Sequence, residues 1–167
     1  HRCTTMIRRI ELSEVILSTH CHATEDLEKV KKALMNAIPL DLRSVTQLHT
    51  EILHGYHGNP IVKLEARFKG DDAYKVVEYI LSSISDVDKK YLLSSLDMRY
   101  NVKDNKLFLR IDKQEAYLGN LVLYEGDDSI KISISFSMIR SEDAVREFLE
   151  RMLTEARRNE GKHVSGT

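Results

Sequence analysis

The stretch Ile130-Lys131-Ile132-Ser133-Ile134-Ser135-Phe136-Ser137-Met138 alternates apolar and polar side chains without interruption. Successive side chains of a β-strand point to opposite faces of a sheet, so this pattern predicts a strand with one face in the core and one in water. On a helix, the same apolar residues would be scattered around the axis. The fold therefore contains a sheet with one apolar face and one polar face.

Other segments repeat this strand signal. Val62, Leu64, Ala66 and Phe68 alternate with Lys63, Glu65 and Arg67, and Leu107, Leu109 and Ile111 share one face of a further strand. Together with β-branched and apolar runs elsewhere, strands are predicted over residues 10–19, 45–54, 62–68, 107–111, 121–124 and 130–138.

Amphipathic helices are predicted between these strands. Apolar residues recur at helical spacing over 24–38, 73–84, 85–96 and 141–158, with N-caps at Thr24, Asp71, Ser85 and Ser141. Neighbouring strands mixed with one-sided helices predict an α+β fold: two layers, a largely antiparallel sheet, and amphipathic helices packed on one face. Two layers leave the other face of the sheet open to a partner.

Length and composition narrow the class of protein. The 167 residues, 42% hydrophobic and 31% charged, are typical of one globular domain, predicted over 1–167 with a core at about 10–158 and a flexible tail at 159–167. No run approaches the roughly 18 apolar residues of a membrane span, and we expect a cytoplasmic protein. Cys3 and Cys21 are expected to be reduced thiols. A net charge of −1 argues against a strongly basic nucleic-acid binder but leaves room for a local basic face.

The segment Asp112-Lys113-Gln114-Glu115-Ala116-Tyr117-Leu118-Gly119 is densely polar, and such a segment is either a solvated turn or a recognition site at a strand end. In a recognition site, Lys113 contacts phosphate, Gln114 pairs with a base edge or sugar, and Tyr117 stacks on an unpaired base. The carboxylates of Asp112 and Glu115 form a general acid/base pair in the alternative interpretation.

Two further groups of residues are candidates for binding. The turn from Gly55 to Pro60 includes His57, Gly58 and Asn59; it is either a plain hairpin turn or an anion-binding nest of backbone amides. Lys63 and Arg67 lie on the polar side of one predicted strand and are candidates for phosphate contacts. His20, His22, His49, His54 and His57 have no spacing typical of a zinc site, and no metal or cofactor is predicted.

Three of these segments, taken in order, resemble a known family. Cys21-His22-Ala23-Thr24-Glu25-Asp26, Gly55-Tyr56-His57-Gly58-Asn59-Pro60-Ile61 and the segment 112–119, followed by Gly126-Asp127-Asp128, resemble the small archaeal RNA-binding proteins described as predicted exosome subunits. The resemblance spans about residues 10–155. It implies an α+β RNA-binding fold like that of a large-subunit ribosomal protein, and a role near RNA processing or degradation. The residues it carries over are His22, Thr24, Glu25, His57, Gly58, Asn59, Lys113, Gln114 and Tyr117.

We therefore expect a non-enzymatic RNA-binding protein, an accessory of RNA processing or degradation associated with an exosome-type complex. It is expected to have no catalytic residues, no membrane partner and no DNA specificity. Two alternatives stay open: a small-molecule or metal-dependent enzyme that uses His22, His57, Asp112 and Glu115, and a protein–protein adaptor.

Overall fold

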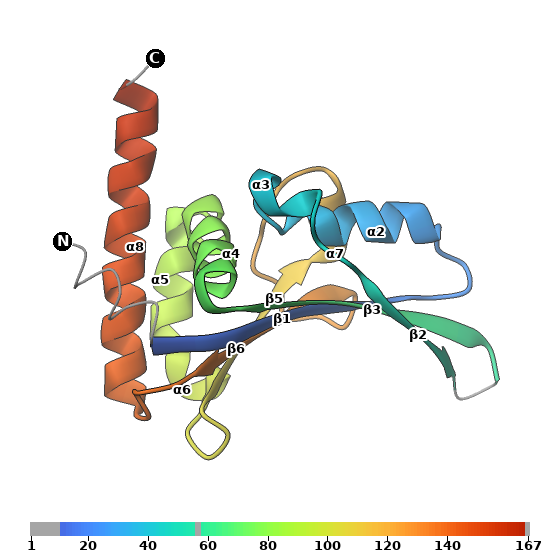
Figure 1. The fold of residues 1–167 in the computed structure, drawn as a ribbon, viewed down its shortest axis with the longest axis horizontal. Helices are drawn as coiled ribbons and strands as arrows, with labels where there is room; N and C mark the ends of the chain where they lie inside the picture. The colour runs from blue at the N-terminus through green and yellow to red at the C-terminus, as the bar shows by residue number, and fades with distance from the viewer. Residues whose placement is uncertain (1–10, 56–57, 166–167) are drawn as a thin grey trace.

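The computed structural model describes residues 11–55 and 58–165, with side chains described as far as Glu155 (Figure 1). The strands are β1 (Leu12–Cys21), β2 (His49–His54), β3 (Pro60–Lys69), β4 (Tyr100–Asn101), β5 (Lys106–Asp112) and β6 (Ser129–Phe136). The helices are α2 (Leu27–Asn36), α3 (Leu40–Arg43), α4 (Gly70–Ser83), α5 (Asp86–Ser94), α6 (Leu96–Arg99), α7 (Lys113–Tyr117) and α8 (Glu142–Ser165).

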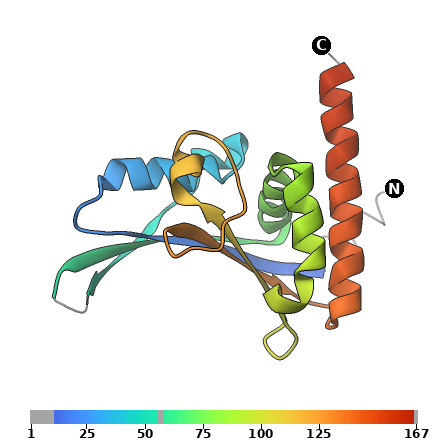
Figure 2. The same cartoon turned by 180° about the vertical axis from the view of Figure 1, so that it is seen from behind.

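The six strands form one sheet in the order β2-β3-β1-β6-β5-β4, and every pair of neighbours is antiparallel. Helices α2, α4 and α5 lie on one side of this sheet, and the long helix α8 packs against α4 and α5 (Figures 1 and 2). The predicted α+β fold, with two layers and helices on one face of an antiparallel sheet, is confirmed.

The two faces of the sheet differ as the alternation predicts. On the helix-covered face, Leu17 of β1, Leu109 of β5 and Ile132 of β6 are at most 1% exposed and join the core. The opposite face, which we call the open face, carries the alternate residues of β1, β3, β6 and β5, and these are half-buried or exposed. In both views the open face arches between the β2–β3 hairpin and the β4–β5 turn (Figures 1 and 2).

Two predicted N-caps are confirmed and two are wrong. The hydroxyl groups of Ser85 and Ser141 accept hydrogen bonds at 3.1 Å from the third residue beyond each of them. Thr24 is not a cap, because residues 22–25 first form a turn, and the carboxylate of Asp26 caps α2 instead. Helix α4 begins at Gly70, ahead of Asp71, and has no side-chain cap.

Three predicted segments also differ from the structure. β2 begins at His49 rather than at residue 45, because α3 and the Thr46 hydroxyl, which donates to the Leu42 carbonyl, hold residues 45–48 outside the sheet. The predicted strand 121–124 forms a single bridge, between Leu123 and Ile111. The polar segment after Asp112 is the short helix α7, neither a turn nor a bare strand end.

The described part of the chain contains no helix long and apolar enough to cross a membrane. α8 extends to Ser165 and overlaps the predicted tail, which stays a prediction. Cys21 is a buried free thiol whose Sγ lies 3.7 Å from the carbonyl oxygens of His22 and Glu25. Cys3 lies outside the described residues.

Candidate nucleic-acid interface

Lys113 joins three of the segments that carry the family resemblance. Its Nζ lies 2.9 Å from a carboxylate oxygen of Glu25, 2.8 Å from Asp128 and 2.9 Å from the carbonyl oxygen of His20. The residue is only 4% exposed. The ammonium therefore has an acceptor in each of three directions and connects the end of β1, the start of α7 and the loop before β6.

The electrostatics of this cluster, Lys113 with Glu25 and Asp128, favour the charged forms. Burial lowers the pKa of Lys113, but hydrogen bonds to Asp128 and Glu25 outweigh burial and hold that pKa above its ordinary value. The hydrogen bond from Lys113 likewise holds the pKa of the Asp128 carboxyl below its usual range. The two directions agree, and both describe a stable ion pair within the protein.

The other residues of the 112–119 segment support α7. The Asp112 carboxylate accepts from the backbone amides of Gln114 and Glu115 and caps the helix, and Glu115 accepts from the Asn120 side chain at 3.1 Å. The carboxylates of the proposed acid/base pair thus both have local hydrogen-bond partners. The Gln114 amide lies 3.5 Å from Asp128 and is exposed.

His22, Thr24 and Glu25 come from the turn that precedes α2. His22 and Thr24 are exposed, and Glu25 accepts from the His22 backbone amide at 3.0 Å while it pairs with Lys113. The structure therefore brings these three residues to the same end of the sheet as Lys113 and Gln114.

Tyr117 lies on the helical side of the molecule, away from the open face. Lys32 and Lys29 of α2 place their ammonium groups 4.9 and 5.9 Å from the centre of its ring. A groove of about 390 Å³ between α2 and α7 is lined by Tyr117 together with Gln114 and Leu118. The ring is half-buried and packs on the core, and the predicted stacking on a base stays a prediction.

The β2–β3 hairpin tip is closed by its own backbone. Gly55 donates to the Asn59 carbonyl at 2.7 Å, and Gly58, at φ 81°, donates to the Gly55 carbonyl at 2.8 Å. Two of the amides expected in an anion-binding nest are thus already used within the turn. His57 lies outside the described residues.

Lys63 and Arg67 lie on the open face, and both are in ion pairs. Arg67 contacts Glu65 at 3.0 Å and Glu14 at 3.4 Å, and Lys63 contacts Glu65 at 3.7 Å. Lys69 shares Glu14 at 3.9 Å. In the β1–β3 half of the open face, each of these three cations therefore has a carboxylate partner.

The β5–β6 half of the open face differs. Arg110 of β5 lies directly opposite Lys131 of β6, and Lys106 lies on the same side of β5. Like charges in direct cross-strand register destabilise a sheet, and no carboxylate of the described residues forms an ion pair with any of the three. Folding alone does not favour this arrangement of cations. A bound polyanion would stabilise it, because its charges offset the repulsion between the cations.

Two aromatic residues accompany these cations. Phe108 lies on the open side of β5, between Lys106 and Arg110. The Lys131 ammonium lies 5.0 Å from the centre of its ring. Tyr124 donates its backbone amide to Arg110 and, since the adjacent Leu123 faces the core, its side chain is on the open side. A Cβ at Gly126 would overlap the Tyr124 ring in its present position, so the ring would have to move.

Sequence reasoning did not select Arg110, Lys131, Phe108 or Tyr124. The alternation of β5 and β6 places the first three on the polar side, and that signal was available. The cross-strand register that sets Arg110 against Lys131 is a tertiary property, and the sequence carries no local sign of it.

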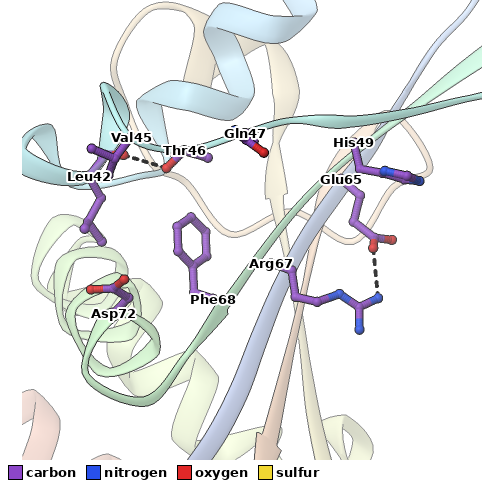
Figure 3. A pocket seen from close by; sticks show the side chains of 9 residues that line it. All are labelled: Leu42, Val45, Thr46, Gln47, His49, Glu65, Arg67, Phe68 and Asp72. Carbon is purple, nitrogen blue, oxygen red and sulfur yellow. Dashed lines mark hydrogen bonds and ion pairs between the residues drawn. The ribbon is translucent and has the colours of Figure 1, made fainter.

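A second hollow, of about 560 Å³, opens beside β3 where the chain leads into the start of β2 (Figure 3). Phe68 points into it from β3, with Leu42 and Val45 above and Asp72 of α4 beside it, while the Glu65–Arg67 ion pair lies on the opposite side of the strand. The carboxylate and the guanidinium that line this hollow therefore already neutralise each other.

His20 of β1 lies on the open face, opposite Lys63 of β3. Burial, followed by the charges of Lys63, His22 and Lys113, holds the pKa of His20 below its ordinary value, which favours a neutral imidazole at neutral pH. In the described part of the chain, no group of three or more His, Cys, Asp or Glu side chains is arranged to hold a metal ion.

Two known proteins are similar to this chain over most of its length. The chain is 34% identical over 142 residues to the uncharacterized protein MJ0213 of Methanocaldococcus jannaschii, covering 83% of this chain and 95% of that protein. It is 33% identical over 153 residues to the RNA-binding protein PAB1135 of Pyrococcus abyssi, covering 87% and 98%.

Solved structures of archaeal proteins have a similar fold. Protein AF2318 of Archaeglobus fulgidus has a TM-score of 0.73 at 29% identity, covering 85% of this chain and 99% of its own. Protein SSO0741 of Sulfolobus solfataricus has a TM-score of 0.71 at 28% identity, covering 85% and 98%. A family model described as RNA binding matches residues 14–136, which include the whole sheet except the first two residues of β1. The resemblance seen in the sequence is thus confirmed, and the chain belongs to this RNA-binding family.

Proposed function

We propose that the protein binds RNA, without catalysing a reaction on it, through the β5–β6 half of the open face. The observation that carries this proposal is the direct register of Arg110 and Lys131, with Lys106 on the same side and no carboxylate paired to any of them. Phosphate groups offset the repulsion between such cations and form charge-assisted hydrogen bonds with them. Membership of the RNA-binding family supports the choice of polyanion.

Lys113 takes a different part in this proposal from the phosphate contact predicted for it. Its ammonium already has three acceptors within 3.0 Å, and RNA would have to displace at least one of them. We assign it a structural role: its ion pairs and hydrogen bond connect α7 to the loop before β6 and to the end of β1, and so stabilise the fold rather than contact RNA.

A salt series tests the proposal. Three unpaired cations that each neutralise one phosphate of a single strand give a slope of about −2 for log affinity against log salt, from about −0.7 per phosphate. Lys131→Gln reduces the size of that slope by about 0.7. Lys90→Gln, which removes an exposed cation of α5 on the helical side, is the matched control and leaves the slope unchanged. A flat salt series, or equal effects of the two variants, contradicts the proposal.

An accessory role in RNA processing or degradation, associated with an exosome-type complex, is the finer part of the proposal and is supported by the family resemblance alone. Purification of the tagged protein from its own cells, with nuclease treatment before elution, tests it. Recovery of ribonuclease subunits after that treatment supports the role, and their loss together with the RNA contradicts it.

A further inference from the structure

Two adjacent rows of residues cross the open face of the sheet and differ at their β5 ends. One row across the strands reads Arg67, Ile16, Ser133, Phe108, and the next reads Glu65, Ser18, Lys131, Arg110, which is followed by Tyr124 on the neighbouring segment. At the β5 end, an aromatic ring therefore lies beside two cations. Neighbouring strands are about 4.8 Å apart, so Phe108, Lys131 and Arg110 lie within reach of one or two nucleotides.

Folding provides no evident reason for an aromatic ring at Phe108. Its neighbours on β5, Leu107 and Leu109, are at most 1% exposed beneath the helices, whereas Phe108 is half-buried on the face that the helices leave open. The residue directly opposite Phe108 on the adjacent strand β6 is Ser133, whose small side chain covers little of an aromatic ring. The contact described over the ring is with the Lys131 ammonium, a mobile group that a ligand can displace.

We infer that this surface selects single-stranded RNA, an inference that rests on the proposed function. An unpaired base stacks on the ring of Phe108, and a second base can stack on Tyr124. Lys131 and Arg110 bind the adjoining phosphates. Aromatic rings accept any base by stacking, so the surface is tolerant of sequence. In a duplex the bases are already stacked and paired, and their faces are closed to the ring. When a base stacks on Phe108, it displaces the Lys131 ammonium from the ring, and that ammonium can then bind a phosphate.

The glycine beneath Tyr124 supports its place in this arrangement. Because a Cβ at Gly126 would overlap the Tyr124 ring, glycine at this position lets the ring keep the place it has in the structure. This assigns a physical role to Gly126, one of the residues that carry the family resemblance.

The test compares a mixed-sequence single-stranded RNA of twelve nucleotides with its blunt duplex, by fluorescence anisotropy at one salt concentration. The wild-type protein is expected to bind the single strand at least about 10-fold more tightly. Phe108→Leu, which keeps apolar volume but removes the ring, lowers single-strand affinity about 5- to 50-fold and leaves the duplex affinity unchanged. Phe108→Tyr, which keeps a ring, retains single-strand affinity.

The outcomes separate this inference from the function on which it rests. Equal wild-type affinity for the two RNAs, or unchanged binding by Phe108→Leu, overturns stacking; if Lys131→Gln still weakens binding, RNA binding on this face stands. If Lys131→Gln has no effect either, the proposed function itself is wrong. The comparison of single strand with duplex uses wild-type protein, so it decides the matter even if a variant at Phe108 does not fold.

Discussion

The two halves of the open face carry similar numbers of cations in opposite electrostatic situations. On β1 and β3, Lys63, Arg67 and Lys69 share the carboxylates of Glu14 and Glu65. On β5 and β6, no carboxylate of the described residues forms an ion pair with the cations, and two of them face each other across the strands. A cation in an ion pair must lose its partner before it binds phosphate. The number of basic residues on a strand therefore identifies a nucleic-acid surface less well than the partners that those residues already have.

The largest effect is expected when both facing cations are removed. The double variant Arg110→Gln/Lys131→Gln lowers affinity for single-stranded RNA about 30- to 100-fold, since each lost charge-assisted contact contributes about 1–1.4 kcal/mol here. Stability does not fall, because a repulsive cross-strand pair is removed. Anisotropy titration and urea unfolding measure the two quantities.

The control for that variant changes the paired half without changing its net charge. Arg67→Gln/Glu65→Gln removes a cation together with its partner, and RNA affinity is expected to stay within about threefold of wild type. Equal losses in the two double variants would show that the halves do not differ, and would remove the reason for placing RNA on β5 and β6.

Lys113 is the extreme case of a paired cation, and its removal is expected to affect stability rather than binding. Lys113→Met leaves Glu25 and Asp128 without their shared partner. Breaking a buried ion pair costs about 3–5 kcal/mol, and because both carboxylates reach solvent we expect about 2 kcal/mol of lost unfolding free energy. Urea unfolding gives this value, and RNA affinity of the folded variant stays within about threefold. The reverse result, weaker binding at unchanged stability, would restore the phosphate contact predicted from the sequence.

Freeing cations of the paired half should produce a smaller gain. Glu65→Gln removes the carboxylate shared by Lys63 and Arg67, which makes both more available to phosphate. We expect RNA affinity to rise about two- to fourfold at low salt, with the gain lost at high salt, because exposed ion pairs are weak and screened. A decrease in affinity would mean that Glu65 itself contributes to binding.

The smallest effect concerns pH. Because Lys113 holds the pKa of Asp128 below its usual range, the ionised carboxyl stabilises the folded state. That contribution is fully present above the unfolded-state pKa of about 4 and is lost as pH falls through the lower folded-state pKa. The difference in unfolding free energy between wild type and Asp128→Asn is therefore constant from neutral pH to about pH 5 and shrinks in acid. A difference that grows on acidification would contradict this ion pair.

Much of the fold was predictable because its signals are local. The alternation in β3, β5 and β6 identified their buried faces, and Ser85 and Ser141 act as the caps that their positions indicated. The predicted N-cap of α2 is wrong because Thr24 and Asp26 are both residue types that cap helices. The turn before α2 makes Asp26 the cap, and Glu25 of that turn bonds the His22 amide and pairs with Lys113.

The candidate site was less predictable for a related reason. Lys63 and Arg67 were selected by their side of β3, which is correct, but their carboxylate partners come partly from β1. Lys113 looked free in a polar run, yet its acceptors lie far away in the chain, at His20, Glu25 and Asp128. Whether a cation is paired depends on tertiary contacts, and the sequence pattern shows only its face.

Crosslinking locates bound RNA on the molecule. A single-stranded RNA containing 4-thiouridine is bound to the wild-type protein at low salt, irradiated and digested, and the modified peptides are identified by mass spectrometry. We predict crosslinks in residues 106–112 and 121–131, at Phe108 and Tyr124 above all. Crosslinks confined to α2 and α7, around Tyr117, would show that RNA lies on the helical side and would contradict binding on the β5–β6 half of the open face.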